Sequence, residues 1–202
     1  MRTLLLALLL VGSAEIPKVA VAETASALTA PVSLDSTAVA TLVAHVRNGA
    51  CPLPGVATGG QPDSSTLVAL ARGGLRTVLD LRAAEEARGF AEASVAESLG
   101  LRYVTLPVTP ATLTDSTFDA FRAFMREGGG ESMFVHCASG NRVGVMLLPW
   151  LVLDQHWTVE RATPLIESVG LRSEEMRARA LEYIRTHSPS PPAKPAQPSR
   201  KR

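Results

Sequence analysis

The chain has 202 residues, of which 46% are hydrophobic and 19% are charged, and its formal net charge is +1. This length is enough for one domain with a substantial apolar core. The charge excludes a nucleic-acid footprint, because the only concentration of basic residues lies in a short C-terminal tail.

The N-terminus has the pattern of a secretory signal peptide. Arg2 precedes an apolar run over residues 4–11, and Ala22 closes a small-x-small cleavage site, with Ala14 closing an alternative one. The run is too short to span a bilayer comfortably, and no later stretch reaches the roughly 18 apolar residues that a membrane helix needs. We therefore expect a signal peptide over residues 1–22 and a periplasmic or secreted protein without a membrane span. The alternative is an uncleaved N-terminal anchor.

Residues 23–49 predict a polar leader that contains a possible short helix at 38–46. From residue 50 to residue 187 the apolar patterns alternate between strand and helix spacing. Strands are expected at 56–58, 76–81, 101–106 and 132–136. Helices are expected at 64–71, 83–99, 117–126, 158–169 and 173–186, with another directly after Arg142. This alternation predicts an α/β fold of three layers, with a mostly parallel sheet flanked by helices. The basic, proline-rich tail at 188–202 is expected to be disordered.

Cys137 directly follows the expected strand at 132–136, and a helix pattern begins after Arg142. The backbone N–H groups of the intervening loop would converge on an anion above the sulfur. The four loop residues are Ala138, Ser139, Gly140 and Asn141. His136 and Arg142 add positive potential, and such surroundings favour thiolate over thiol.

Arg142 offers a planar fork of donors that matches two oxygens of a phosphate or a sulfate. With Cys137 as nucleophile, this arrangement resembles the active-site loop of cysteine-dependent phosphatases. Most tyrosine and dual-specificity phosphatases have five residues between the cysteine and the arginine, whereas this chain has four. The shorter loop is also similar to that of many rhodanese-type sulfurtransferases.

Several segments in order resemble the beta-lactamase-hydrolase-like phosphatase domain family, bacterial relatives of dual-specificity and protein tyrosine phosphatases. They are Thr58-Gly59-Gly60-Gln61-Pro62, Gly74-Leu75-Arg76-Thr77-Val78-Leu79-Asp80-Leu81-Arg82, Gly100-Leu101-Arg102-Tyr103-Val104, Pro107-Val108 and His136-Cys137-Ala138-Ser139-Gly140-Asn141-Arg142. The similarity covers about residues 50–170. It implies a dual-specificity-phosphatase-like fold, a phosphorylated protein or small molecule as substrate, and no cofactor.

The resemblance makes Cys137 the nucleophile and Arg142 the anion clamp, while His136 tunes the thiolate. It also calls for an aspartate general acid from a loop before the preceding helix, where Asp115 is the only carboxylate. Asp115 fits equally well as a first-turn residue that stabilises the helix dipole. Val143 replaces the Ser or Thr that often follows the arginine.

Two cysteines are present, and Cys51 would act as a resolving thiol if it reached Cys137; the alternative is an unpaired, partly buried residue. No metal site is expected, because the histidines are scattered in the sequence. Three functions remain open: an exported phosphatase with a phosphocysteine intermediate, a sulfurtransferase with a Cys137 persulfide, and a non-catalytic anion-binding module.

Overall fold

The computed structural model describes residues 36–128 and 132–188. The predicted signal peptide, residues 23–35 of the predicted leader and residues 189–202 of the predicted tail lie outside these residues. None of the helices in the described ranges is long and apolar enough to cross a membrane. The possible short helix predicted at 38–46 lies at 36–43.

Strands and helices alternate along the chain, as the sequence predicts. The strands are β1 (Ala50–Leu53), β2 (Val56–Gly59), β3 (Thr77–Asp80), β4 (Arg102–Thr105) and β5 (Met133–His136). The helices are α1 (Ser36–Val43), α2 (Ser64–Arg72), α3 (Glu92–Ser98), α4 (Asp115–Glu127), α5 (Asn141–Leu153), α6 (Val159–Ser168) and α7 (Glu174–His187).

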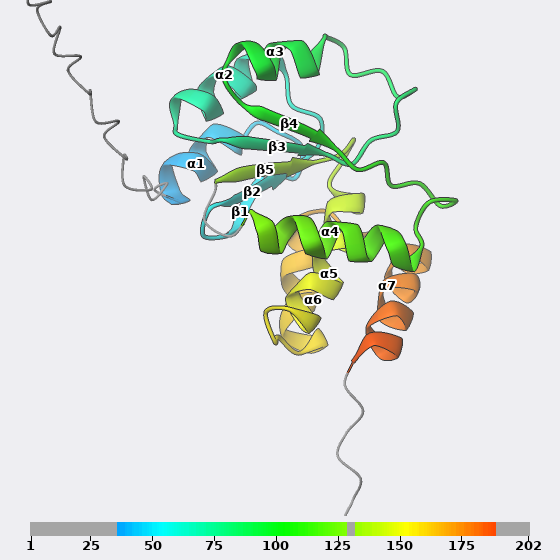
Figure 1. Cartoon of the computed structure of the whole chain (residues 1–202). Coiled ribbons are helices and arrows are strands. Elements are labelled where there is room, and N and C mark those ends of the chain that lie inside the picture. The colour runs from blue at the N-terminus through cyan, green and yellow to red at the C-terminus, as the bar shows by residue number, and fades with distance from the viewer. Residues whose placement is uncertain (1–35, 129–131, 189–202) are drawn as a thin grey trace, which may run out of the picture. The chain divides into compact units, whose positions relative to one another are not determined.

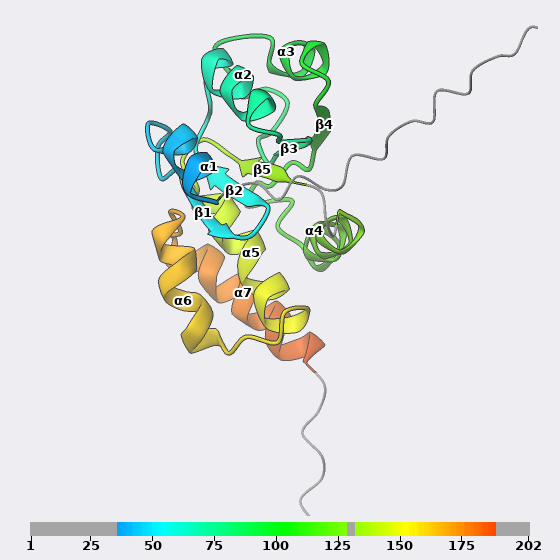
Figure 2. The ribbon, with the colours of Figure 1, turned by 90° about the vertical axis from the view of Figure 1, so that its left-hand side faces the viewer.

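The five strands form one sheet in the order β1-β2-β5-β3-β4, in which only β1 is antiparallel to its neighbour. Helices α1, α2 and α3 cover one face of the sheet, and α4 to α7 lie on the other (Figure 1). The view turned by 90° shows the same division (Figure 2). The prediction of a three-layer α/β fold with a mostly parallel sheet is confirmed.

Strand β5 lies at the centre of the sheet because its residues are apolar on both faces, as expected for a parallel strand covered on both sides. Phe134 belongs to the core under α1 to α3, and Val135 belongs to the core under α4 to α7. His136 pairs in register with Gly59 of β2 and Asp80 of β3. The carboxyl ends of three parallel strands therefore meet at one edge, where open α/β sheets bind ligands.

The helix predicted at 83–99 is wrong in its first half. Residues 81–91 form a loop, and α3 begins only at Glu92. The run is rich in alanine and glutamate, which favour helix. However, Gly89 has a positive φ of 80°, and the side chains of Glu86 and Arg88 are held by ion pairs to other segments. These tertiary contacts override the local helix propensity.

Strand β1 was not expected, because Pro52 indicates a turn rather than a strand. It lies at the edge of the sheet and pairs with β2 only. Proline is tolerated there, since an edge strand leaves N–H groups that need no partner in the sheet.

Candidate active site

Cys137 lies directly beyond β5 and is almost fully buried, with 1% of its surface exposed. Its backbone N–H donates to the carbonyl of Gly59, 3.3 Å away, which extends the pairing of β5 with β2 past the end of the strand. The backbone N–H of Gly140 points at the sulfur, with 3.1 Å between N and Sγ. One loop amide therefore approaches the sulfur. The convergence of the loop N–H groups on an anion stays a prediction.

The loop after Cys137 is fixed from three sides. Gly140 has a φ of 84°, and a Cβ there would lie 2.0 Å from the carbonyl oxygen of Val169. The amide Nδ2 of Asn48 donates to the carbonyl of Ser139 at 2.7 Å. On the third side, Gly60 forms a bridge with Ser139. These contacts hold the backbone of the loop in a defined conformation.

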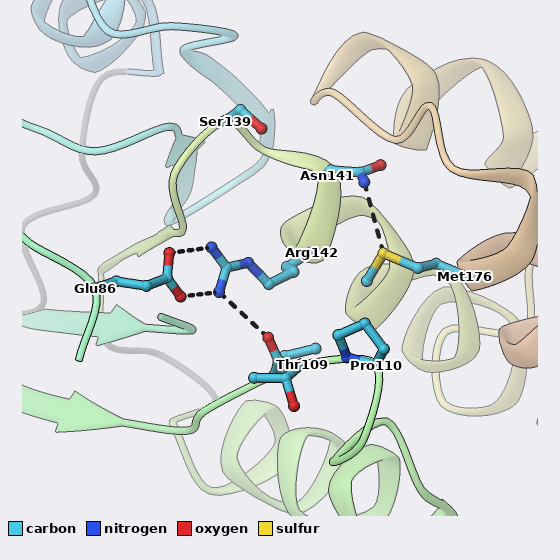
Figure 3. A pocket seen from close by; sticks show the side chains of 8 residues that line it. Glu86, Thr109, Pro110, Ser139, Asn141, Arg142 and Met176 are labelled. Carbon is cyan, nitrogen blue, oxygen red and sulfur yellow. Dashed lines mark hydrogen bonds and ion pairs between the residues drawn. The ribbon is translucent and has the colours of Figure 1, made fainter. Parts of the chain in front are cut away.

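Arg142, the second residue of α5, forms a two-pronged ion pair with the carboxylate of Glu86. Its Nη1 lies 2.5 Å from Oε1 of Glu86, and its Nη2 lies 2.8 Å from Oε2 (Figure 3). The same Nη1 also donates to the carbonyls of Leu81 at 3.3 Å and Val108 at 3.2 Å. These contacts, all donated by Nη1 and Nη2, hold one side of the guanidinium in place.

Glu86 is the site residue that the sequence did not reveal. In the sequence, Arg82, Glu85 and Glu86 form a short charged run that predicts a solvated cluster. This prediction is wrong, because Arg82 is buried and Glu86 is only partly exposed. The hydrogen bond from Arg142 lowers the pKa of the Glu86 carboxyl to about 2. The reverse effect raises the pKa of Arg142, again chiefly through Glu86. No signal in the sequence marks Glu86, since its neighbours read as helix.

A cleft of about 350 Å³ opens beside Arg142. It is lined by Glu86, Val108, Thr109, Pro110, Ser139, Asn141, Arg142 and Met176. Three of these residues belong to the loop and the helix start that follow Cys137 (Figure 3). Asn141 closes one side, because its Nδ2 lies 3.6 Å from the sulfur of Met176 on α7. The cleft thus lies between residues 138–141, which we call the anion loop, α7 and the segment after β4.

Residues 54–186 match the model of a family described as a dual-specificity or tyrosine phosphatase fused to NAD+ kinase, PTP-NADK. The chain belongs to this phosphatase family. The match covers the whole strand-loop-helix unit around Cys137, so the family accounts for the region that builds the cleft.

Two curated relatives agree with the resemblance found in the sequence. Both are named beta-lactamase hydrolase-like protein and come from strains of Xylella fastidiosa. Each is 33% identical over 103 residues, which make up 49% of this chain and 24% of the relative. The matched stretch therefore spans about a quarter of the length of these relatives, and the predicted kinship with their phosphatase-like domain is confirmed.

Solved structures confirm the fold. A putative phosphatase of the DUF442 group from Shewanella putrefaciens superposes with a TM-score of 0.61 at 19% identity, covering 72% of this chain and 97% of its own. TpbA from P. aeruginosa has a TM-score of 0.53 at 17% identity, covering 69% of this chain and 84% of its own. The dual-specificity-phosphatase-like architecture predicted for this family member is therefore present.

Asp115, the predicted general acid, is the first residue of α4 and pairs with Arg179 of α7. Arg179 also donates to the carbonyl of Leu113 at 3.2 Å. About half of the Asp115 side chain is exposed, and the residue does not line the cleft. The role of Asp115 as an acid stays a prediction, and it requires release of the carboxylate from Arg179.

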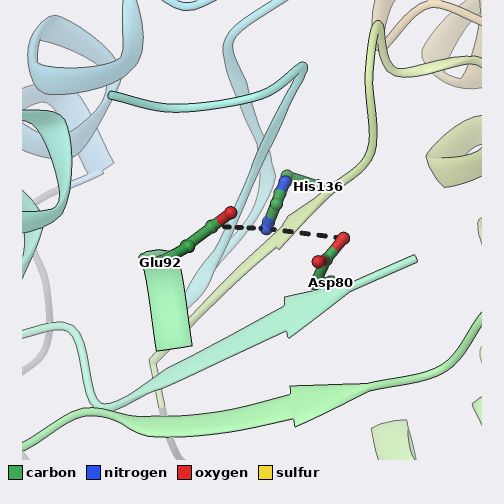
Figure 4. A group of neighbouring side chains, drawn as sticks. All are labelled: Asp80, Glu92 and His136. Carbon is green, nitrogen blue, oxygen red and sulfur yellow. Dashed lines mark ion pairs between the residues drawn. The ribbon is translucent and has the colours of Figure 1, made fainter. Parts of the chain in front are cut away.

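His136 points to the opposite side of the sheet from Cys137, because side chains alternate along a strand. It is fully buried and stacks on Phe134 with ring centroids 5.4 Å apart. Its Nε2 lies 2.9 Å from Oε1 of Glu92 and 3.9 Å from Oδ1 of Asp80 (Figure 4). The pair with Glu92 is close, although its angles are poor for a hydrogen bond. Any effect of His136 on the thiolate therefore acts through the backbone or the field, without side-chain contact.

Asp80, Glu92 and His136 have potential ligand atoms within 4.8 Å of one another. A cation already lies beside them, since Nη2 of Arg88 is 2.6 Å from Oδ2 of Asp80. Tyr103 donates to the same carboxylate at 2.8 Å, and its pKa is raised by burial and by this bond. The guanidinium of Arg88, which also lies 4.0 Å from Glu92, supplies the positive charge that these two buried carboxylates need.

Cys51 lies in β1, partly buried, and both cysteines carry free thiols. Burial raises the pKa of the Cys51 thiol, which leaves it a weaker nucleophile. A resolving role for Cys51 stays a prediction.

Proposed function

We propose that this protein is an exported cysteine-dependent phosphatase that hydrolyses a phosphate monoester through a phosphocysteine intermediate. The observation that carries the proposal is the loop: a cysteine at the end of the central strand, a loop amide on its sulfur, and an arginine clamp at the start of the next helix. Membership in a phosphatase family supports the same chemistry.

In the first step the thiolate of Cys137 donates an electron pair to phosphorus. The bond from phosphorus to the ester oxygen breaks, and this oxygen keeps its electron pair and takes a proton. Arg142 and the loop N–H groups neutralise the charge on the transferred phosphoryl group. In the second step water attacks phosphorus, the sulfur–phosphorus bond breaks, and inorganic phosphate leaves while the thiolate is restored.

Glu86 acts on this reaction as a positioning residue. Its carboxylate is held ionised by Arg142, with a pKa of about 2, so it is unsuited to donate a proton near neutral pH. Of the residues that line the cleft, Glu86 is the only carboxylate. Proton donation therefore falls to Asp115 once it leaves Arg179, or to water for esters with good leaving groups.

One observation favours a second function. The loop has four residues between Cys137 and Arg142, which resembles sulfurtransferases that form a persulfide. The same loop without turnover would make the protein an anion-binding module.

Whole-protein mass spectrometry separates these functions. Reduced protein is incubated with phenyl phosphate or with thiosulfate and quenched in acid, and Cys137→Ser is the control. The proposal expects a gain of one phosphoryl group on wild type only. A gain of one sulfur from thiosulfate would establish the sulfurtransferase instead, and no adduct from either donor would leave the binding module.

Export rests on the N-terminal pattern alone. Fractionation of bacterial cells that express the full chain tests it, and we expect a shortened protein in the periplasm or the medium. Full-length protein in the cytosolic fraction would contradict export without touching the chemistry.

A further inference from the structure

A second hollow borders the same loop after Cys137. Its volume is about 320 Å³, and it is lined by Arg47, Asn48, Ser139, Asn141, Gly170 and Arg172. Ser139 and Asn141 also line the cleft beside Arg142. The two hollows are therefore adjacent, and a molecule bound at Arg142 can extend over these two residues into the second one.

The second hollow is basic and contains no carboxylate. Arg47 and Arg172 are both exposed, and neither forms an ion pair with a carboxylate of the described residues. Nη1 of Arg172 donates to two backbone carbonyls, while no bond from its Nε or Nη2 is described. This differs from Arg142, which forms an ion pair with Glu86.

Acidic residues near the hollow are engaged elsewhere. Glu167 and Glu174 share a neighbouring depression with Arg172. Both carboxylates pair with Arg177 instead, at 2.9 and 3.6 Å. The positive charge of Arg172 is thus left for a ligand.

The backbone of the hollow is rigidly connected to the loop. Asn48 holds the carbonyl of Ser139, and a Cβ at Gly170 would lie 2.7 Å from that same oxygen. Oδ1 of Asn141 accepts from the backbone N–H of Arg172 at 2.7 Å. The two arginines are therefore attached to the same loop that binds the reacting phosphate.

We infer that the hollow between Arg47 and Arg172 is a subsite for a second phosphate group on the same small-molecule substrate. A phosphate dianion balances two guanidinium groups, whereas a carboxylate balances only one, and the guanidinium fork suits phosphate oxygens. The preferred substrate class is a bisphosphorylated ester. This inference rests on the proposed phosphatase function.

The test compares phenyl phosphate with the three phenylene bisphosphates, whose second phosphate lies at different spacings. The variant is the double substitution Arg47→Ala and Arg172→Ala, which keeps the backbone contacts of both residues. Arg185→Ala, on α7, is the control, since it likewise removes an exposed arginine but lies outside the residues that line the hollow. For each enzyme the readout is kcat/KM at low and at high salt.

We expect the double variant to lose about five- to tenfold more kcat/KM on at least one bisphosphate than on phenyl phosphate, the size expected of exposed charge pairs. The difference should shrink in high salt, where exposed charges are screened. Arg185→Ala should leave all ratios unchanged. Equal losses on all four substrates would overturn the inference while leaving the phosphatase function intact.

If the wild type turns over none of these esters, a binding measurement tests the second-phosphate subsite separately from the proposed phosphatase activity. Calorimetry then compares binding of the bisphosphates and phenyl phosphate to Cys137→Ser, with and without the two alanine substitutions. Tighter binding of a bisphosphate that depends on the arginines supports the subsite on its own. Its absence overturns the subsite.

Discussion

Cys137 and His136 are consecutive in the sequence, yet they lie in opposite environments. On the side of Cys137 the backbone N–H of Gly140 points at the sulfur, and Arg142 lies at the start of the helix that follows. On the side of His136 the ring is enclosed by Glu92, Asp80 and Phe134, with no opening to the cleft. The difference shows that consecutive residues at the end of one strand can face a proposed reaction site on one side of the sheet and a closed, buried cluster on the other.

Cys137→Ser gives the sharpest test of the reactive side. We expect kcat/KM for phenyl phosphate to fall by at least about 10³-fold, because the hydroxyl is a far weaker nucleophile than a thiolate. The free energy of unfolding should change by no more than about 1 kcal/mol, since the two side chains have similar shape. Turnover and urea denaturation measure the two quantities, and residual activity near wild type would exclude Cys137 as the nucleophile.

Gly140→Ala should damage the same side through the backbone. The φ of 84° and the contact of 2.0 Å to Val169 predict a loss of about 3 kcal/mol, or a displaced loop with little activity. Gly100→Ala is the control, because Gly100 also has a positive φ, of 74°, but a Cβ there meets nothing within 4 Å. The control should lose only about 1 kcal/mol. Equal losses in urea denaturation would contradict the close packing of the loop.

His136→Phe breaks the network on the other side. The variant leaves Glu92 without its imidazole neighbour in a buried site, and we expect a loss of about 2 kcal/mol in the free energy of unfolding. The pH dependence of kcat/KM decides whether His136 also tunes the thiolate. A shift of the acidic limb to higher pH would support tuning, whereas an unchanged profile would leave His136 a structural residue.

Glu86→Gln has the smallest expected effect and a defined pH dependence. The pKa of Glu86 is about 2 in the folded protein and about 4.3 in an unfolded chain. The folded state is therefore stabilised above about pH 4.3, and this contribution is lost as the pH falls towards 2. We expect the wild type to exceed Glu86→Gln by about 1 kcal/mol at pH 7 and to lose that advantage near pH 2.

Thermal denaturation from pH 2 to pH 7 measures this dependence. Glu85→Gln is the matched control, because Glu85 is exposed and forms no ion pair among the described residues. The control should follow the wild type at every pH. A constant gap between wild type and Glu86→Gln across the range would contradict the ion pair with Arg142.

The reactive side was largely predictable from the sequence. A buried apolar strand, a cysteine, a glycine-containing loop and an arginine at a helix start are local features, and they place Cys137 and Arg142 correctly on the strand-loop-helix unit. The partners of these residues were not predictable. Glu86 lies 56 positions before Arg142 in a helix-favouring run, and only the folded chain brings the two together.

The sequence also could not reveal the surroundings of the His136 side chain. Adjacency to Cys137 in sequence suggested a shared environment, but the alternation of side chains along β5 separates the two. Glu92 and Asp80, which contact the histidine, come from α3 and β3. The periodicity of apolar residues predicts helices and strands, but it does not predict which charged residues pair across the fold. The paired residues recur at no regular spacing in the sequence.

Helix α1 and the turn that follows it lie outside the family match, which begins at residue 54. This N-terminal segment nevertheless provides Asn48, which holds the carbonyl of Ser139, and the carbonyl of Arg47, which accepts from Gly60 at 2.7 Å. A recombinant fragment trimmed to the matched residues would lack both of these hydrogen bonds. Assays on such a fragment would measure a loosened loop and underestimate the proposed activity, so domain boundaries for this chain should be set at or before residue 36.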